Sequence, residues 1–228
     1  MAGETRTANF LMDQFARIGK GLSSPQRLRM LELLAQAERG VDEIAQACGL
    51  SIANASQHLQ SLRRAGLAAS RKEGLHVYYS LADPAVYELW RAMQRLGESR
   101  LAEVREFMSG EFDDGATRPP VTADELVAAV TAADITLVDV RPLAEYRHAH
   151  IPGALSLPLD EITGRFAEAL QSGDVVVYCR GPYCLLGPRA VREFSRVGVP
   201  ASRLTLSVPG WTSQGHPTER GDTAEDLE

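Results

Sequence analysis

The stretch of residues 174–184 constrains the fold of this chain more than any other segment. Its three valines, 175–177, form a short β-branched run that is typical of a buried parallel strand. The run ends at Cys179, and Gly181 and Pro182 exclude regular structure just after it. Apolar residues at helical spacing follow. A cysteine is therefore expected between the carboxyl end of a strand and the amino end of a helix, where open α/β sheets bind ligands.

This position favours a reactive thiol at Cys179. Loop N–H groups and the dipole of the next helix stabilise an anion, and Arg180 adds a positive charge, so we expect the thiolate form. The alternative is a buried and inert cysteine, which is common for free thiols. The adjacent Gly-Pro and a second cysteine, Cys184, in the same loop argue against that alternative.

The composition places few other limits on the chain. Its 228 residues suggest one or two domains. An odd count of three cysteines suits reactive thiols in a reducing cytoplasm better than a disulfide framework. No apolar run approaches the length of a membrane span, and the start has no signal-peptide pattern. We therefore expect a cytoplasmic protein that does not associate with membranes.

The net charge of −6 is unevenly distributed. Residues 1–112 carry 14 Lys and Arg against 13 Asp and Glu, whereas residues 113–228 carry 10 against 17. The amino-terminal half is thus not a basic domain by net charge. A role in nucleic-acid binding must depend on where its charges lie.

A helix-turn-helix is predicted in the amino-terminal half. Its helices cover residues 41–48 and 52–65, joined by a Gly-containing turn, and a hairpin over residues 67–81 with its tip at 71–74 adds a wing. A solvated polar face on an ordinary helical hairpin is the alternative. The residues expected to contact DNA are Ser51, Asn54, Ser56, Gln57 and His58 near the start of the second helix, Arg63 and Arg64 at its end, and Arg71 and Lys72 at the hairpin tip.

Residues 10–108 resemble the ArsR family of winged-helix repressors. The resemblance is carried by the segments LSSPQRLRMLELL and VDEIAQACGLSIANASQHLQSLRRAGLAASRKEGLHVYYSL. It implies a homodimer, with the first and last helices at the interface, that binds a roughly palindromic double-stranded operator. A long apolar-striped helix predicted over residues 84–108 agrees with such an interface.

No metal site and no cofactor are expected. Metal-sensing members of the family carry Cys-x-Cys on the helix before the turn, whereas this chain has only Cys48 there. A lone thiolate is not a metal site, so we expect Cys48 in the core. The pair His148 and His150 has weak spacing and lacks companion ligands.

The carboxyl-terminal half is predicted to be an α/β domain. Strands alternate with helices, which indicates a parallel sheet covered on both faces. The fold class is therefore two domains, a mainly-α winged helix-turn-helix followed by an α/β domain with a central parallel sheet. The expected strands are 135–140, a short one near residue 155, 174–178 and 204–208, with a partly helical stretch at 159–170. The expected segments are a winged-helix domain at 1–108, a linker at 109–120, the α/β domain at 121–218 and a disordered acidic tail at 219–228.

Residues 119–218 resemble a single rhodanese, or sulfurtransferase, domain. The segments LVDVRPLAEYRHAHIPGALSLPL, VVVYCRGPYC and PGWTSQGHP occur in the family's order. The resemblance implies that Cys179 is the sulfur-accepting nucleophile, that Asp139 and Arg141 support the site, and that Trp211 lies at the site rim or in the core. The implied loop consists of the catalytic pair Cys179 and Arg180 followed by Gly181, Pro182, Tyr183 and Cys184.

Several functions are compatible with these features. The leading hypothesis is a DNA-binding regulator, by resemblance a repressor, in which Cys179 accepts sulfane sulfur from thiosulfate or a persulfide and so senses reactive sulfur or redox state. The alternative is an active sulfurtransferase with an accessory DNA-binding module. A third hypothesis is a redox switch that uses a disulfide between Cys179 and Cys184. A phosphatase or arsenate reductase is disfavoured because Leu185 stands where an oxyanion loop needs arginine.

Overall fold

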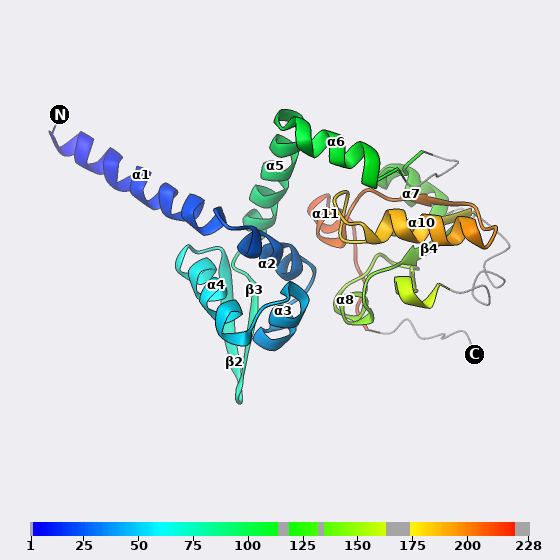
Figure 1. Ribbon diagram of the computed structural model, residues 1–228, viewed down its shortest axis with the longest axis horizontal. Coiled ribbons are helices and arrows are strands. Elements are labelled where there is room, and N and C mark those ends of the chain that lie inside the picture. Colours follow the sequence, from blue (N-terminus) through cyan, green and yellow to red (C-terminus); the bar gives the residue numbers. More distant parts are fainter. Residues whose placement is uncertain (1, 114–118, 132–134, 163–173, 222–228) are drawn as a thin grey trace. The chain divides into compact units, whose positions relative to one another are not determined.

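The computed structural model describes residues 2–113, 119–131, 135–162 and 174–221 (Figure 1). The chain forms two compact units, Met1–Leu96 and Gly97–Glu228. The predicted fold class, a winged helix-turn-helix followed by an α/β domain with a parallel sheet, is confirmed. The units meet earlier in the chain than the boundary that we expected after residue 108.

The first unit contains a helical bundle and a small antiparallel sheet with the strand order β1-β3-β2. The helix-turn-helix consists of α3 and α4, and β2 and β3 form the wing (Figure 1). The helices are α1 (Ala2–Leu22), α2 (Pro25–Gln36), α3 (Val41–Cys48), α4 (Ile52–Arg64) and α5 (Pro84–Arg100), the last of which continues into the second unit. The strands are β1 (Arg39–Gly40), β2 (Ala68–Glu73) and β3 (His76–Leu81).

The turn between α3 and α4 follows from its local sequence. Gly49 ends α3 with φ 66°, a left-handed conformation that favours glycine. Ser51 caps α4, since its hydroxyl accepts a hydrogen bond from the Asn54 N–H at 3.3 Å. Cys48 is buried in the core of this unit, as predicted, and burial raises the pKa of its thiol.

The wing turns later than we predicted. Its two-residue turn is Gly74-Leu75, and Glu73 pairs with His76 across it. Gly74 has φ 59°, which a tight hairpin turn requires and which side chains disfavour. Arg71 and Lys72 therefore lie within strand β2 and not at the tip.

The prediction of one continuous helix over residues 84–108 is also wrong. The segment is divided into α5 and α6 (Ala102–Glu111), because Leu101 between them adopts an extended backbone with φ −103° and ψ 115°. The weak helix formers Gly97 and Ser99 precede this break.

The second unit contains a four-stranded parallel sheet with the order β5-β4-β6-β7. Its strands are β4 (Ile135–Asp139), β5 (Leu155–Ser156), β6 (Asp174–Tyr178) and β7 (Ala201–Arg203). Its other elements are α6, α7 (Ala123–Thr131), α8 (Leu143–His148), the 3₁₀ turn η1 (Leu159–Glu161), α10 (Leu186–Arg196) and α11 (Val208–Ser213) (Figure 1).

Successive residues of β6 face two separate cores, as the alternation of a strand requires. Val175 and Val177 join one cluster, which includes Phe194 of α10. Val176 and Tyr178 join the other, which also contains side chains from α7, α8 and α11. The sheet is therefore covered on both faces. Trp211 of α11 is buried in the second cluster, which resolves its predicted role in favour of the core.

The strand predicted at residues 204–208 lies earlier, at β7. Ser207 accepts a hydrogen bond from the Gly210 N–H at 3.2 Å and so caps α11, with Pro209 in its first turn. A cap and a proline at that position start a helix and end the extended chain. Leu204 forms an isolated bridge to Val121, and its N–H donates to the Val177 carbonyl at 2.9 Å.

The predicted linker and tail are partly structured. Residues 109–111 belong to α6 and Phe112 is buried, whereas 114–118 lie outside the described residues. Residues 163–170 of the expected helical stretch also lie outside them, as do residues 222–228 of the tail. Before that tail segment, Glu219 forms a two-residue antiparallel bridge with His150.

Candidate functional site

The site is the loop that connects β6 to α10 in the second unit (Figure 1). Cys179 directly follows β6, and Cys184 lies just before α10. Gly181 adopts φ 119°, a conformation that side chains rarely adopt, and its carbonyl accepts a hydrogen bond from the Cys184 N–H at 3.1 Å. This turn folds the loop back, so the side chains of both cysteines are buried in the same cluster.

Cys179 lies deep in the site. Its residue is 4% exposed, and its sulfur lies 3.7 Å from the carbonyl oxygens of both Gly181 and Cys184. The N–H groups of Gly181 and Gly187 also face this sulfur. A Cβ added at Gly187 would lie 3.2 Å from the Cys179 sulfur, so the glycine allows α10 to approach the thiol closely.

The ionisation of the pair differs from our expectation of a Cys179 thiolate. The hydrogen bond to Cys184 and burial raise the pKa of Cys179 well above its ordinary value. The same hydrogen bond lowers the pKa of Cys184 to about 7, against the effect of burial. The N–H groups of Leu186 and Arg180 and the charge of Arg180 help to lower it. The pair therefore favours ionisation of Cys184 over that of Cys179.

Arg180 pairs with a buried carboxylate and does not reach outward. Its guanidinium donates to Glu145 of α8, with Nη2 2.7 Å from Oε1 and Nε 3.1 Å from both oxygens. The Glu145 side chain is fully buried and that of Arg180 is 23% exposed. This bidentate ion pair fixes the position of Arg180 at the start of the loop. The sequence offered no signal for Glu145, because its partner lies 35 positions away.

Asp139 and Arg141 form a second buried ion pair at the end of β4, next to β6. Both side chains have no exposed surface, and Arg141 Nη2 lies 2.6 Å from Asp139 Oδ2. Arg141 also donates to the Ala149 carbonyl at 2.7 Å, and its guanidinium lies 5.6 Å from the centre of the Tyr178 ring. Because Tyr178 immediately precedes Cys179, the Asp139–Arg141 ion pair stabilises the end of β6 that carries the thiol.

Tyr183 lies between the two cysteines in sequence and makes a contact that sequence reasoning missed. Its hydroxyl donates to Glu98 Oε2 at 2.6 Å. Both residues belong to the second unit, and Glu98 lies near the end of α5. The cysteine loop is thus hydrogen-bonded to the end of α5, the helix that begins in the first unit.

The described residues contain no group of three His, Cys, Asp or Glu side chains that could hold a metal ion. His150 is fully buried, stacks on Tyr146 with ring centres 3.8 Å apart, and places Nδ1 2.9 Å from the Tyr146 carbonyl. Its position is that of a structural residue.

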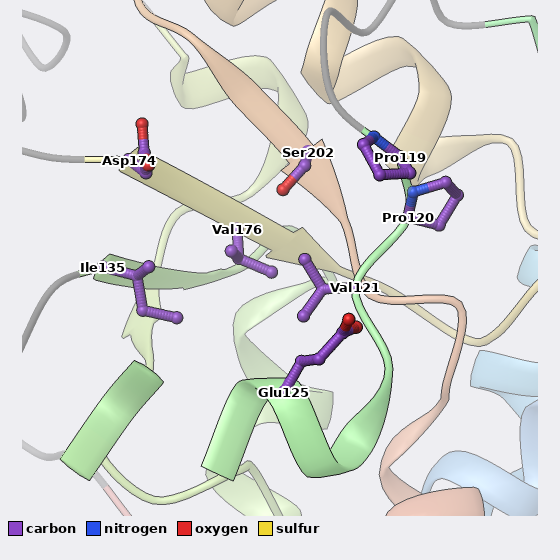
Figure 2. Close-up of a pocket in the computed structure, with 8 residues that line it drawn as sticks. All are labelled: Pro119, Pro120, Val121, Glu125, Ile135, Asp174, Val176 and Ser202. Atoms are coloured by element: carbon purple, nitrogen blue, oxygen red, sulfur yellow. The ribbon is translucent and has the colours of Figure 1, made fainter. Parts of the chain in front are cut away.

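A pocket of about 300 Å³ lies elsewhere in the same unit. Figure 2 shows its residues between the start of α7 and the strands, with Ile135 and Asp174 at the beginnings of β4 and β6. Val176 lines it from the face of the sheet opposite to that of Val175 and Val177. The pocket is therefore at the other end of β6 from Cys179 and is separate from the cysteine loop.

The predicted DNA-contacting residues are distributed over α4 and β2 in the first unit. Asn54, Gln57, Arg63 and Arg64 are exposed, whereas Ser56 and His58 are half-buried. Ser51 is exposed, but its hydroxyl is used as the helix cap. The start of α4 thus presents amide side chains to solvent, and its end presents two guanidinium groups.

Strand β2 is less basic than its sequence indicated. Arg71 forms an ion pair with Glu38 at 2.6 Å and a second with Glu73, and it lies 4.6 Å from the centre of the Tyr78 ring. These carboxylates raise the pKa of Arg71 and offset its charge. Lys72 is exposed on the same strand.

The comparisons with known proteins match both halves of the chain. Residues 24–70 match the family described as bacterial regulatory protein, arsR family, and residues 122–214 match the rhodanese-like domain. The chain is 39% identical over 221 residues to the HTH-type transcriptional regulator Rv0324 of Mycobacterium tuberculosis, covering 97% of each sequence.

Two further relatives match the amino-terminal half. The chain is 37% identical over 100 residues to the uncharacterized HTH-type transcriptional regulator Rv0081 of Mycobacterium tuberculosis, which covers 42% of this chain and 88% of that protein. It is 41% identical to a solution structure titled as the homodimeric winged helix-turn-helix DNA-binding domain of Mb0332 from Mycobacterium bovis. That match covers 42% of this chain and 88% of the other, with a TM-score of 0.40. Separately, no helix among the described residues has the length and hydropathy that crossing a membrane requires.

Proposed function

Because the chain belongs to the ArsR family of transcriptional regulators and carries a rhodanese-like domain, we propose that it couples DNA binding to sulfane sulfur. The rhodanese-like domain accepts a sulfur atom at Cys179, and the resulting persulfide changes the affinity of the winged helix for its operator. The observation that supports this most directly is the cysteine pair: two buried cysteines lie in one loop, and the Cys184 carbonyl oxygen lies 3.7 Å from the Cys179 sulfur.

The pair explains how a thiol with a raised pKa can attack. We take a low-molecular-weight hydropersulfide as the donor. The Cys179 sulfur bonds to its outer sulfur, the S–S bond of the donor breaks, and the donor leaves as a thiol. The Cys179 proton passes to the Cys184 thiolate and from there to the leaving thiolate, so Cys184 ends unchanged. Amide groups of Gly181 and Gly187 remain beside the new persulfide and stabilise its anion.

The DNA-binding form is proposed to be a homodimer, as in the relative from Mycobacterium bovis. Helix α1 exposes four large apolar side chains with exposures of 44–61%, and α5 exposes two more at 40% and 60%. Apolar surface on this scale is typical of an interface. The exposed side chains are Phe10, Leu11, Met12 and Phe15 of α1, and Leu89 and Leu96 of α5.

In this dimer α4 lies in the major groove of a two-fold operator. Asn54 and Gln57 contact base edges, since each side-chain amide can form two hydrogen bonds with one base. Arg63, Arg64 and Lys72 contact phosphates. Arg71 contributes less, because its charge is offset by Glu38 and Glu73.

The test uses the full-length chain and operator fragments selected by it from a random DNA pool. Binding is measured with and without a glutathione hydropersulfide donor for the wild type, Cys179→Ser and the matched control Cys48→Ser. We expect the donor to shift the affinity of the wild type and of Cys48→Ser by about 5–150-fold, the usual range of allosteric coupling, and to leave Cys179→Ser unchanged. Equal affinity under all conditions would contradict sensing.

An active sulfurtransferase remains the second candidate, because the rhodanese-like domain match covers the whole cysteine site. Turnover of thiosulfate with an excess of a thiol acceptor separates the two functions. A sensor takes up one sulfur per chain and stops, whereas an enzyme continues to transfer sulfur in proportion to time.

A further inference from the structure

The second cysteine of the loop has a chemical role that the rhodanese-like match does not assign. Cys184 lies in the same enclosure as Cys179, its residue is 9% exposed, and its carbonyl oxygen lies 3.7 Å from the Cys179 sulfur. Both cysteine side chains are buried in the same cluster, and the Cys179 thiol donates to the carbonyl oxygens of Gly181 and Cys184. No other nucleophile needs to enter the site for a reaction between these two sulfur atoms.

The surroundings of Cys184 hold its sulfur as an anion ready to attack. The Leu186 and Arg180 N–H groups point at it, and the Arg180 guanidinium lies near it. Leu186 is the first residue of α10, so its N–H is one that the helix leaves without an internal partner. A thiolate beside a sulfur that has just been oxidised is the arrangement that thiol–disulfide exchange requires.

We propose that Cys184 resolves the Cys179 persulfide, so that the lasting product of sulfur uptake is a Cys179–Cys184 disulfide and free hydrosulfide. The proposal rests on the proposed function, which supplies the persulfide. The Cys184 thiolate attacks the inner sulfur of Cys179–S–SH. A new S–S bond joins the two cysteines, the bond to the outer sulfur breaks, and that sulfur leaves with the electron pair and its proton as HS⁻.

Formation of this disulfide needs no oxidant other than the sulfane sulfur of the donor. The two electrons removed from the cysteines reduce the sulfane sulfur of the donor to hydrosulfide. The disulfide closes a short loop that contains Gly181, Pro182 and Tyr183, and it replaces a thiolate and a thiol by a neutral bond. Return to the starting state needs a dithiol reductant of the thioredoxin class. The signal therefore outlasts the donor and ends by reduction.

Cys48 provides a matched control. It is also buried, but it lies in the core of the first unit, and burial raises its pKa without a second thiol as partner. Cys48→Ser therefore removes one of the three thiols and leaves the loop intact.

The experiment exposes the full-length wild type, Cys48→Ser and Cys184→Ser to an excess of glutathione hydropersulfide without oxygen. Intact mass, alkylation of free thiols and released hydrosulfide are measured. We expect the wild type and Cys48→Ser to lose two hydrogens, to lose two alkylatable thiols and to release one hydrosulfide per chain. Cys184→Ser, which also lacks the proton acceptor of the pair, should gain one sulfur atom more slowly than the wild type gains its disulfide, keep that sulfur on Cys179 and release none.

The outcomes separate the two proposals. A wild type that keeps the extra sulfur on Cys179 while Cys184 stays alkylatable overturns the resolving role and leaves sulfur acceptance intact. If neither the wild type nor Cys184→Ser changes in mass or releases hydrosulfide, sulfur acceptance fails and the resolving step fails with it. The wild-type result alone decides the question if Cys184→Ser does not fold.

Discussion

Removing the Cys179 thiol should move the ionisation of Cys184 in a direction that depends on the replacement. The largest contribution to the low pKa of Cys184, about 7 against an ordinary 9.0, is the hydrogen bond from Cys179. Cys179→Ala removes that donor and should raise the pKa of Cys184 toward its ordinary value. Cys179→Ser keeps a hydroxyl donor at the same position and should preserve the low value.

The size of the effect follows from these two values. At pH 7 about half of Cys184 is thiolate in the wild type, whereas a thiol with a pKa of 9.0 is about one-hundredth ionised, so the thiolate population falls about 50-fold. Thiolate nucleophilicity rises with pKa with a Brønsted coefficient near 0.5, which recovers about tenfold. The reactivity of Cys184 should therefore fall about fivefold at pH 7 and exceed that of the wild type above about pH 8.

The assay is an ultraviolet absorbance titration of the thiolate in a Cys48→Ser background, combined with alkylation rates of Cys184 across the same pH range. Cys179→Ala should titrate at higher pH than Cys179→Ser. Identical midpoints for the two variants, or a Cys184 midpoint near 9 in the presence of Cys179, would refute the hydrogen-bonded pair as the cause of the ionisation.

Three further predictions concern the surroundings of the site and the DNA-binding unit. Asp139→Ala leaves Arg141 buried without its carboxylate and should lower the free energy of unfolding by about 3–5 kcal/mol, measured by urea denaturation; a loss below about 1 kcal/mol would show that the pair adds little. Arg63→Ala should weaken binding to specific and non-specific DNA alike. It should also lower by about one the number of ions released on binding, which is the slope of log affinity against log salt concentration, measured by fluorescence anisotropy over a salt series. Tyr183→Phe removes the hydrogen bond to Glu98 and should reduce the effect of sulfur on operator binding while sulfur uptake by mass spectrometry continues; an unchanged response would exclude this contact from the coupling.

Local patterns predicted the architecture because the elements depend on their own residues. The valine run of β6 alternates between two cores, and the predicted glycine-containing turn of the helix-turn-helix forms at Gly49. The start of α7 is likewise fixed locally by a capping box, in which the Thr122 N–H donates to Glu125 at 2.8 Å. The same dependence explains the errors. The turn of the wing is set by Gly74 and not by the charged residues before it. The helix that begins at residue 84 breaks at Leu101.

The sequence by itself determined that a cysteine loop joins a parallel strand to a helix and that a winged helix precedes it. Only the tertiary structure decided the charge of each group. Glu145 pairs with Arg180, Glu38 offsets Arg71, and ionisation is favoured at Cys184 over Cys179. The physical reason is that ionisation depends on burial and on neighbours brought from distant parts of the chain, and neither is encoded in the residues beside the group.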